Sequence, residues 1–155
     1  MSDAERVRFK HGPERRVRRR ADFLRIQSVG ERASTRHFVL LVARRELEKA
    51  SSIASLPSRL GVVVTKKVGN AVQRSRVKRL CREAFRTWPD LVPNGIDLVV
   101  IARTGAHELD LEKVRTEWKG AHRALRERCR VALSRETPGE PRAKASSSAR
   151  TKAPK

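Results

Sequence analysis

Six basic side chains crowd the fourteen-residue stretch QRSRVKRLCREAFR, from Gln73 to Arg86, in which Glu83 is the single acid. Like charges placed three or four residues apart on a helix repel one another, so an isolated helix would not be built this way. The chemistry available to such a surface is the binding of an anion, and phosphate is the expected one. The basic residues of this stretch are Arg74, Arg76, Lys78, Arg79, Arg82 and Arg86.

Side chains that could carry out catalysis or hold a metal are not grouped anywhere in the sequence. Cys81 and Cys129 are too few and too far apart for a zinc site or a disulfide framework, and we expect reduced, half-buried thiols. The four histidines never stand at ligand spacing to one another or to a cysteine. Neither a Ser, His and Asp grouping nor a glycine-rich phosphate loop is present. The sequence therefore predicts no catalytic residue and no zinc.

The composition as a whole favours a polyanionic partner. The chain has 37 Lys and Arg residues against 17 Asp and Glu, a formal charge of +20 on 155 residues. Nucleic acid is the default partner for such a charge. No apolar run reaches the roughly 18 residues of a membrane span, and the N-terminal residues lack the apolar segment of a signal peptide. We therefore expect a soluble, cytoplasmic protein that does not enter a membrane.

The charge and the apolar residues divide the chain into three parts. Residues 1–20 are predicted to be a basic, disordered extension, and residues 134–155 a basic, disordered tail without an apolar residue larger than alanine. Residues 21–133 contain the apolar runs and are predicted to form one domain. Within it, residues 65–86 carry eight basic residues and one acid, so the positive charge of the domain is concentrated there.

The elements that must position the basic stretch can be predicted from periodicity. Short β-branched apolar runs indicate strands, and apolar residues at steps of three and four indicate helices. The expected order is α-β-β-α-β-α, an α/β (α+β) two-layer sandwich with a small sheet. The predicted elements are a helix over 21–29 that buries Phe23, Leu24 and Ile26, strands over 37–44, 59–66 and 96–103, a helix over 73–86, and a helix over 108–130.

The two longer helices are amphipathic. In the first, Asn70 and Gln73 resemble a capping pair that starts the helix. In the second, acidic and basic residues are mixed on the polar face. The apolar faces predicted to pack on the sheet are Val77, Leu80, Cys81, Ala84 and Phe85 in the first helix, and Leu111, Val114, Trp118, Ala121, Leu125 and Cys129 in the second.

A solvated basic surface is the simplest interpretation of the helix over 73–86. Two observations favour a binding surface instead. A merely soluble helix would place acids among its basic residues, and here only Glu83 does so. Lys66 and Lys67 also precede the helix, so basic side chains and the backbone donors of a helix N-terminus converge.

The segment TKKVGNAVQRSRVKRLCREAFR closely resembles the signature of the bacterial ribonuclease P protein subunit, in which a strand ending in Lys-Lys leads through Gly-Asn-Ala-Val into an Arg-Asn-Arg helix. The resemblance extends over about residues 15–130 and includes RADF, RHFVLL and IDLVVIAR. It implies a mixed sheet with a left-handed crossover at the basic helix. It also implies an RNA-binding subunit of an endonuclease in tRNA processing, whose catalytic RNA uses bound Mg²⁺ to remove the 5′ leader from precursor tRNA.

The resemblance also assigns roles to particular residues. Ser75 replaces the asparagine of the family motif, which puts any contact of that amide in doubt. Phe23 and Phe38 match aromatic positions of the family's leader cleft, with ordinary core residues as the alternative. The residues implied to face the catalytic RNA are Arg74, Arg76, Lys78, Arg79 and Arg82, with Lys66 and Lys67 near its metal-rich junction.

Three other functions are compatible with parts of the sequence. A ribosomal or other RNA-binding protein could use the same basic helix without a cleft for single-stranded RNA. A DNA-binding module is disfavoured because few outward amides are available to read bases and no second helix precedes the basic one. An autonomous nuclease is disfavoured most, because no carboxylate cluster or histidine pair could hold its metal.

Overall fold

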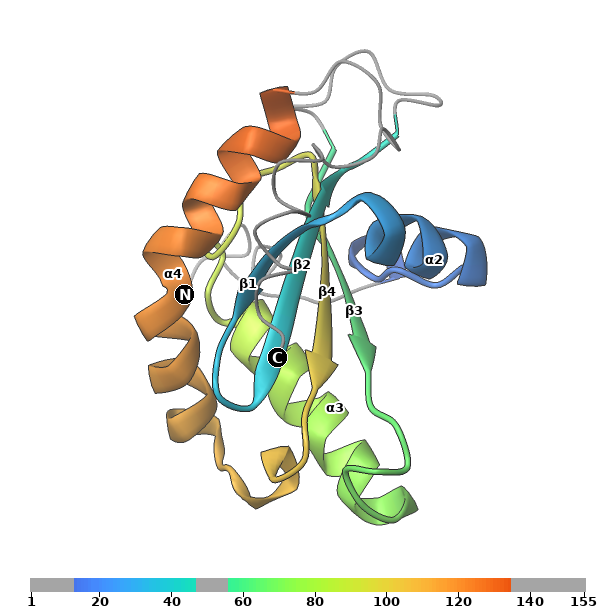
Figure 1. Cartoon of the computed structure of the whole chain (residues 1–155), viewed down its shortest axis with the longest axis vertical. Helices are drawn as coiled ribbons and strands as arrows, with labels where there is room; N and C mark the ends of the chain where they lie inside the picture. The colour runs from blue at the N-terminus through green and yellow to red at the C-terminus, as the bar shows by residue number, and fades with distance from the viewer. Residues whose placement is uncertain (1–12, 47–55, 135–155) are drawn as a thin grey trace, which may run out of the picture.

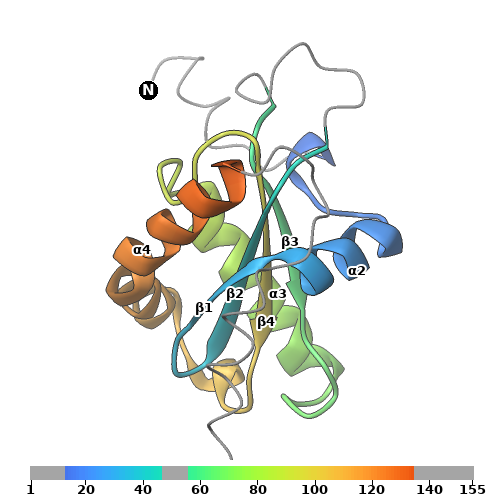
Figure 2. The same ribbon diagram turned by 45° about the horizontal axis from the view of Figure 1, so that its top comes forward.

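The computed structural model describes residues 13–46 and 56–134, which form a four-stranded sheet with helices on both faces (Figures 1 and 2). The predictions made for residues 1–12 and 135–155 lie outside this range. In chain order the elements are η1 (Pro13–Arg15), α2 (Arg20–Val29), β1 (Glu31–Ser34), β2 (Phe38–Arg44), β3 (Arg59–Val63), α3 (Ala71–Arg86), β4 (Ile96–Ala102), η3 (Ala106–Glu108) and α4 (Leu111–Ser134).

The sheet has the strand order β1-β2-β4-β3 and is mixed. The pairs β1–β2 and β2–β4 are antiparallel, whereas β3 and β4 are parallel. In Figure 1 both parallel strands point downward with β4 to the left of β3, and the connecting helix α3 lies behind them. This arrangement is a left-handed crossover, against the usual preference. The predicted sandwich with a mixed sheet is confirmed.

The three predicted strands are present, although β3 ends at Val63 and not at Lys66. The edge strand β1, with the sequence ERAS, was not predicted. Its four residues include only one apolar side chain, Ala33, so neither alternation nor an apolar run marks them. Its pairing with β2 creates the strand.

The sheet has an apolar core on each face, and the two cores differ in size. The larger one lies between the sheet and helices α3 and α4, around Trp118 and Phe38. The smaller one lies between the other face and α2, around Ile26 and Val99. Among the described residues, one short helix covers that second face, and Val63 and Ile101 on it are only partly buried.

The interior faces of α3 and α4 agree with the predicted pattern. All of the predicted residues are buried except Leu80, Leu111 and Ala121, which are partly buried. Cys81 and Cys129 are free, and both are fully buried rather than half-buried. Burial raises the pKa of both thiols, that of Cys129 to about 12.

Helix α2 differs from its prediction in which side chains it buries. Ile26 and Val29 pack into the smaller core, whereas Leu24 is 52% exposed. The predicted burial of Leu24 is therefore wrong. In a helix, residues two positions apart point roughly 200° apart, so Leu24 and Ile26 cannot share a buried face.

The predicted boundary at residue 21 lies too late in the chain. Val17 is 5% exposed, and its N–H donates to Leu60 O over 3.0 Å. Arg15 donates to both the carbonyl and the hydroxyl of Ser58, and its guanidinium lies 5.1 Å from the Phe85 ring centroid. Residues 13–20 therefore belong to the domain, because Val17 contacts β3 and Arg15 contacts Ser58 and α3.

Candidate nucleic-acid interface

The basic helix α3 begins where the sequence predicted it and for the predicted reason. The Asn70 side chain accepts a hydrogen bond from Gln73 N, and the Gln73 side chain accepts one from Asn70 N, both at 2.9 Å. Gly69 makes this box possible, because a Cβ on residue 69 would collide with the Gln73 side chain. The cap fixes the first turn of α3 next to the turn that carries Lys66 and Lys67, both of which are exposed.

The outward face of α3 borders a cleft of about 400 Å³. Glu83 is its one acidic lining residue, and the Glu83 carboxylate is paired with Arg86 on the next turn. Hydrogen bonding with Arg86 lowers the pKa of Glu83, so this carboxylate is ionised at neutral pH. The lining residues are Arg16, Ser75, Lys78, Arg79, Arg82, Glu83 and Arg86.

Three basic residues of this cleft have charges that are available to bind an anion. Lys78, Arg79 and Arg82 form no ion pair or side-chain hydrogen bond within residues 13–46 and 56–134. Their stems extend from a helix whose opposite face is held by Val77 and Cys81, each at most 1% exposed. We define these three residues as the α3 groove set.

The side chains of two other predicted RNA-contact residues are partly engaged within the protein. Arg76 is exposed, but its guanidinium donates to Leu109 O over 2.9 Å and so connects α3 to the turn after η3. Arg74 is partly buried, and its Nε has no hydrogen-bond partner in the part of the chain that the structure describes. Ser75 lines the cleft, so the position that departs from the family motif does face the groove.

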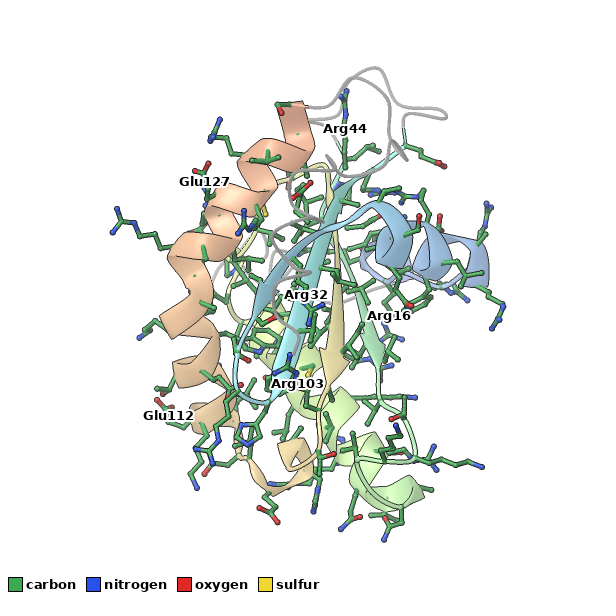
Figure 3. The ribbon with its side chains drawn as sticks, viewed as in Figure 1. Arg16, Arg32, Arg44, Arg103, Glu112 and Glu127 are labelled. Carbon is green, nitrogen blue, oxygen red and sulfur yellow. The ribbon has the colours of Figure 1, made fainter. Side chains whose placement is uncertain are left out.

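Arg16 also lines the cleft, and sequence analysis missed it. It forms a parallel bridge with Leu60 of the edge strand β3, next to which Figure 3 labels it. Its surroundings, ERRVRRR, are a basic run in which only Val17 indicates an attachment point.

The predicted leader-contact residues occupy opposite faces of the sheet. Phe23 is partly buried at the rim of the smaller core, and its ring lies over Gly61, where an added Cβ would come within 2.6 Å of it. Phe38 is 0% exposed and packs edge-on against Trp118, with ring centroids 5.9 Å apart. A buried ring cannot stack on a base, so Phe38 is corrected from a leader contact to a core residue.

The accessible part of the second sheet face is bordered by arginines. In Figure 3, Arg32 and Arg103 lie in front of the sheet, on the face that α3 and α4 leave uncovered. Both arginines are exposed, and Val63 and Ile101 on the same face of the sheet are partly exposed. Phe23, Val63 and Ile101 pack against the same smaller core, and the two arginines lie further along this face of the sheet.

The described part of the chain contains no group of three or more His, Cys, Asp or Glu residues that could hold a metal ion. Within the same ranges, no helix is long and apolar enough to cross a membrane.

Comparison with known proteins gives one consistent result. The family model described as Ribonuclease P matches residues 12–126. The "Ribonuclease P protein component" of Syntrophus aciditrophicus is 43% identical over 88 residues, 57% of this chain and 67% of that protein. That of Brevibacillus brevis is 39% identical over 99 residues, 64% of this chain and 73% of that protein.

Solved structures agree with the sequence comparison. The RNase P protein of Staphylococcus aureus superposes with a TM-score of 0.60 at 29% identity, covering 72% of this chain and 94% of that one. The RNase P protein of Thermotoga maritima superposes with a TM-score of 0.58 at 34% identity, covering 70% and 96%.

Proposed function

The chain belongs to the ribonuclease P protein family, as a protein component of this endoribonuclease of tRNA processing, and we propose that α3 is the surface on which it binds the catalytic RNA. In this proposal the chain supplies binding and not the reacting groups. The RNA-facing residues are Lys78, Arg79 and Arg82, with Arg74, Arg76, Lys66 and Lys67 around them.

The observation that carries the proposal is the uncompensated charge of the α3 groove set. A basic residue with a carboxylate partner loses part of its attraction for phosphate, and these three have no such partner among the described residues. Because the buried face of α3 holds the helix rigidly, little ordering entropy is lost on binding. Neutralising phosphates releases counterions, which makes the affinity depend strongly on salt.

We assign the Mg²⁺ ions of the reaction mainly to the RNA. The exposed surface of α3 is cationic and repels a divalent cation while it attracts phosphate. Mg²⁺ prefers oxygen ligands such as carboxylates and phosphates. The chain would support cleavage by screening RNA phosphates, so that less Mg²⁺ is required.

We further propose that the accessible sheet face binds the 5′ leader of precursor tRNA. Phe23 would provide a stacking surface, and Arg103 and Arg32 would attract the backbone. Phe38 takes no part. A single strand fits this surface because its bases are free to stack on a side chain.

The test is reconstitution of leader cleavage from the full chain, a ribonuclease P RNA and a precursor tRNA. The variant Lys78→Gln, Arg79→Gln, Arg82→Gln removes three charges and no described hydrogen bond. At low Mg²⁺ we expect it to lose most of the cleavage that the unchanged chain supports. At high Mg²⁺ we expect cleavage to return, because metal replaces the lost screening.

A matched control replaces Lys119, Arg123 and Lys113 by Gln, three exposed residues of α4. This control removes the same charge and should support cleavage at low Mg²⁺. If cleavage by the α3 variant stayed absent at high Mg²⁺ while the RNA alone was active there, the protein would have an essential role other than screening. Equal losses in both variants would show that general charge, and not α3, binds the RNA.

A further inference from the structure

A second basic cleft, of about 450 Å³, lies beside the N-terminal end of α2, away from the α3 groove. It is bounded by the segment before α2, by the end of β2 and by the start of β3. We call it the α2 cleft. Its lining residues are Glu14, Arg16, Arg18, Arg19, Asp22, Arg25, Arg45, Glu46, Leu56, Pro57 and Arg59.

Six arginines line the α2 cleft against three carboxylates, and a fourth carboxylate, the buried Asp97, binds two of these arginines, Arg25 and Arg59. Two of the three lining carboxylates already have arginine neighbours, since Asp22 lies 3.7 Å from Arg59 and Glu46 lies 3.7 Å from Arg25. The side chains of Arg16, Arg18 and Arg19 are exposed and have no ion pair or hydrogen bond within the described residues. The cleft therefore has a surplus of positive charge.

Arg45 adds a partly buried cation to this surplus. Its Nη1 donates to Pro57 O over 2.7 Å, but Asp97 Oδ1 is 3.8 Å from its Nε, too far for a hydrogen bond. That Nε is buried and has no hydrogen-bond partner within residues 13–46 and 56–134. Burial, followed by the charge of Arg59, lowers the pKa of Arg45. An anion in the cleft would offset both effects.

The helix α2 contributes backbone donors at the same place. Its N-cap residue, Arg19, makes no capping hydrogen bond with its side chain. The first N–H groups of a helix have no partner within the helix, and the helix dipole is positive at this end. The uncapped start of a ten-residue helix thus coincides with the arginines of the cleft.

We propose that the α2 cleft binds a phosphate group of single-stranded RNA, at a site separate from the α3 groove. Arg16 lines both clefts, so a basic surface runs between them around the edge of β3. Asp97, at the cleft end of β4, is four residues from Ile101 on the accessible sheet face, which corresponds to about 13 Å along the strand.

A single strand suits the α2 cleft better than a duplex does. The space is a recess of about 450 Å³, and Leu56 and Pro57 provide apolar contact for a base or sugar. Phosphates of a duplex lie on a stiff convex surface and cannot enter such a recess one at a time. The proposal depends on the charge and shape of this cleft and not on the role assigned to α3.

The first test measures binding of the full chain to a fluorescent oligouridylate of about ten nucleotides, a length typical of single-strand sites. The variant Arg18→Gln, Arg19→Gln is compared with the control Lys119→Gln, Arg123→Gln, which removes the same charge from α4. We expect the slope of log affinity against log salt to fall by roughly 1 to 1.5 for the α2 variant, at ~0.7 per phosphate contact. The control should lose less than half of that. Equal changes would overturn the proposal, because they would show binding by general charge alone.

The second test locates the anion by nuclear magnetic resonance. Inorganic phosphate is titrated at constant ionic strength while the Nε–H signal of Arg45 and the amide signals of Arg20 and Ala21 are followed. We expect these signals to shift together, and we expect the oligouridylate to displace phosphate from them. Absence of shifts would overturn the site. Shifts that RNA does not reverse would overturn RNA as the source of the phosphate and leave a small-anion site.

Discussion

Arginines have opposite surroundings in two regions of this molecule. Around Asp97, which is 0% exposed, Arg59 makes two hydrogen bonds of 2.7 Å and Arg25 one of 2.8 Å to a single carboxylate. In the α3 groove set, Arg79 and Arg82 have no carboxylate partner within the described residues. Arginine therefore appears once as a structural cross-link and once as an open binding group.

The difference is set by the strand and the helix that present the charges. Asp97 sits in a central strand and points to the face covered by α2, so its charge must be paired where it is. The α3 groove set points away from the sheet, where solvent screens its charges and folding does not require a partner. The Asp97 cluster should thus determine stability, and the α3 groove should determine affinity.

The largest expected effect is the loss of stability on Asp97→Asn. The amide cannot neutralise Arg25 and Arg59, whose side chains are only 13% and 17% exposed. Removing one partner of a buried ion pair costs about 3 to 5 kcal/mol, and the partial exposure of the arginines favours the lower end. Chemical denaturation measures the free energy of unfolding directly. A loss below about 1 kcal/mol would show that Asp97 is not the cross-link inferred here.

The next effect concerns affinity and comes from the α3 groove set. In Lys78→Gln, Arg79→Gln, Arg82→Gln, the slope of log affinity for the catalytic RNA against log salt should shrink by roughly 2 to 3, at ~0.7 to 0.9 per phosphate. The free energy of unfolding should stay within about 0.5 kcal/mol, because surface substitutions without partners have small effects. If this variant lost stability while its salt dependence of RNA affinity stayed unchanged, the α3 groove set would contribute to stability and not to affinity, which is the opposite of what we expect.

The sequence predicted the α3 region well for a physical reason. The spacing of Val77, Cys81 and Phe85 indicates the buried face of the helix. The capping pair of Asn70 and Gln73 indicates where the helix begins. Both signals are local in the chain. The outward direction of the basic residues follows from them by helical geometry alone.

The Asp97 region could not be predicted in the same way. Its members come from α2, β3 and β4, and their contact depends on strand register, such as the pairing of Arg59 with Asp97. A single acid in the apolar strand IDLVVIA was the only local signal. Phe38 shows the same limit, because a strand alternates its faces and only the packing of Trp118 decides which face holds the larger core.

A third prediction compares the two phenylalanines on opposite faces of the sheet. Phe23→Leu should weaken binding of precursor tRNA, but not of mature tRNA, by about 1 to 3 kcal/mol if its ring stacks on one base. Phe38→Leu should lower the free energy of unfolding by about 1 to 2 kcal/mol, because it leaves a void against Trp118. Equal loss for both tRNAs with Phe23→Leu would exclude a leader contact.

The smallest expected effect tests whether the burial of a carboxylate determines how much it contributes to the free energy of unfolding. Glu117 joins α4 to the turn between β1 and β2, where its carboxylate accepts hydrogen bonds from Thr35 Oγ1 at 2.5 Å and from His37 N at 2.6 Å. Like Asp97 it connects distant segments, but its side chain is 15% exposed. Glu117→Gln retains the shape and one acceptor, so we expect a loss of about 1 kcal/mol at neutral pH.

The dependence of this loss on pH identifies the carboxylate as its source. Burial raises the pKa of Glu117, but the hydrogen bonds from Thr35 and His37 outweigh it and the net pKa is lowered. A carboxyl group with a lowered folded-state pKa stabilises the fold fully above its unfolded-state pKa, about 4.3. The contribution disappears as the pH falls through the folded-state value. The difference in unfolding free energy between the unchanged chain and Glu117→Gln should therefore be present at pH 7 and decrease steadily below about pH 4.3. A difference that stayed constant down to the acid limit would mean that packing, and not the charge of Glu117, holds this turn against α4.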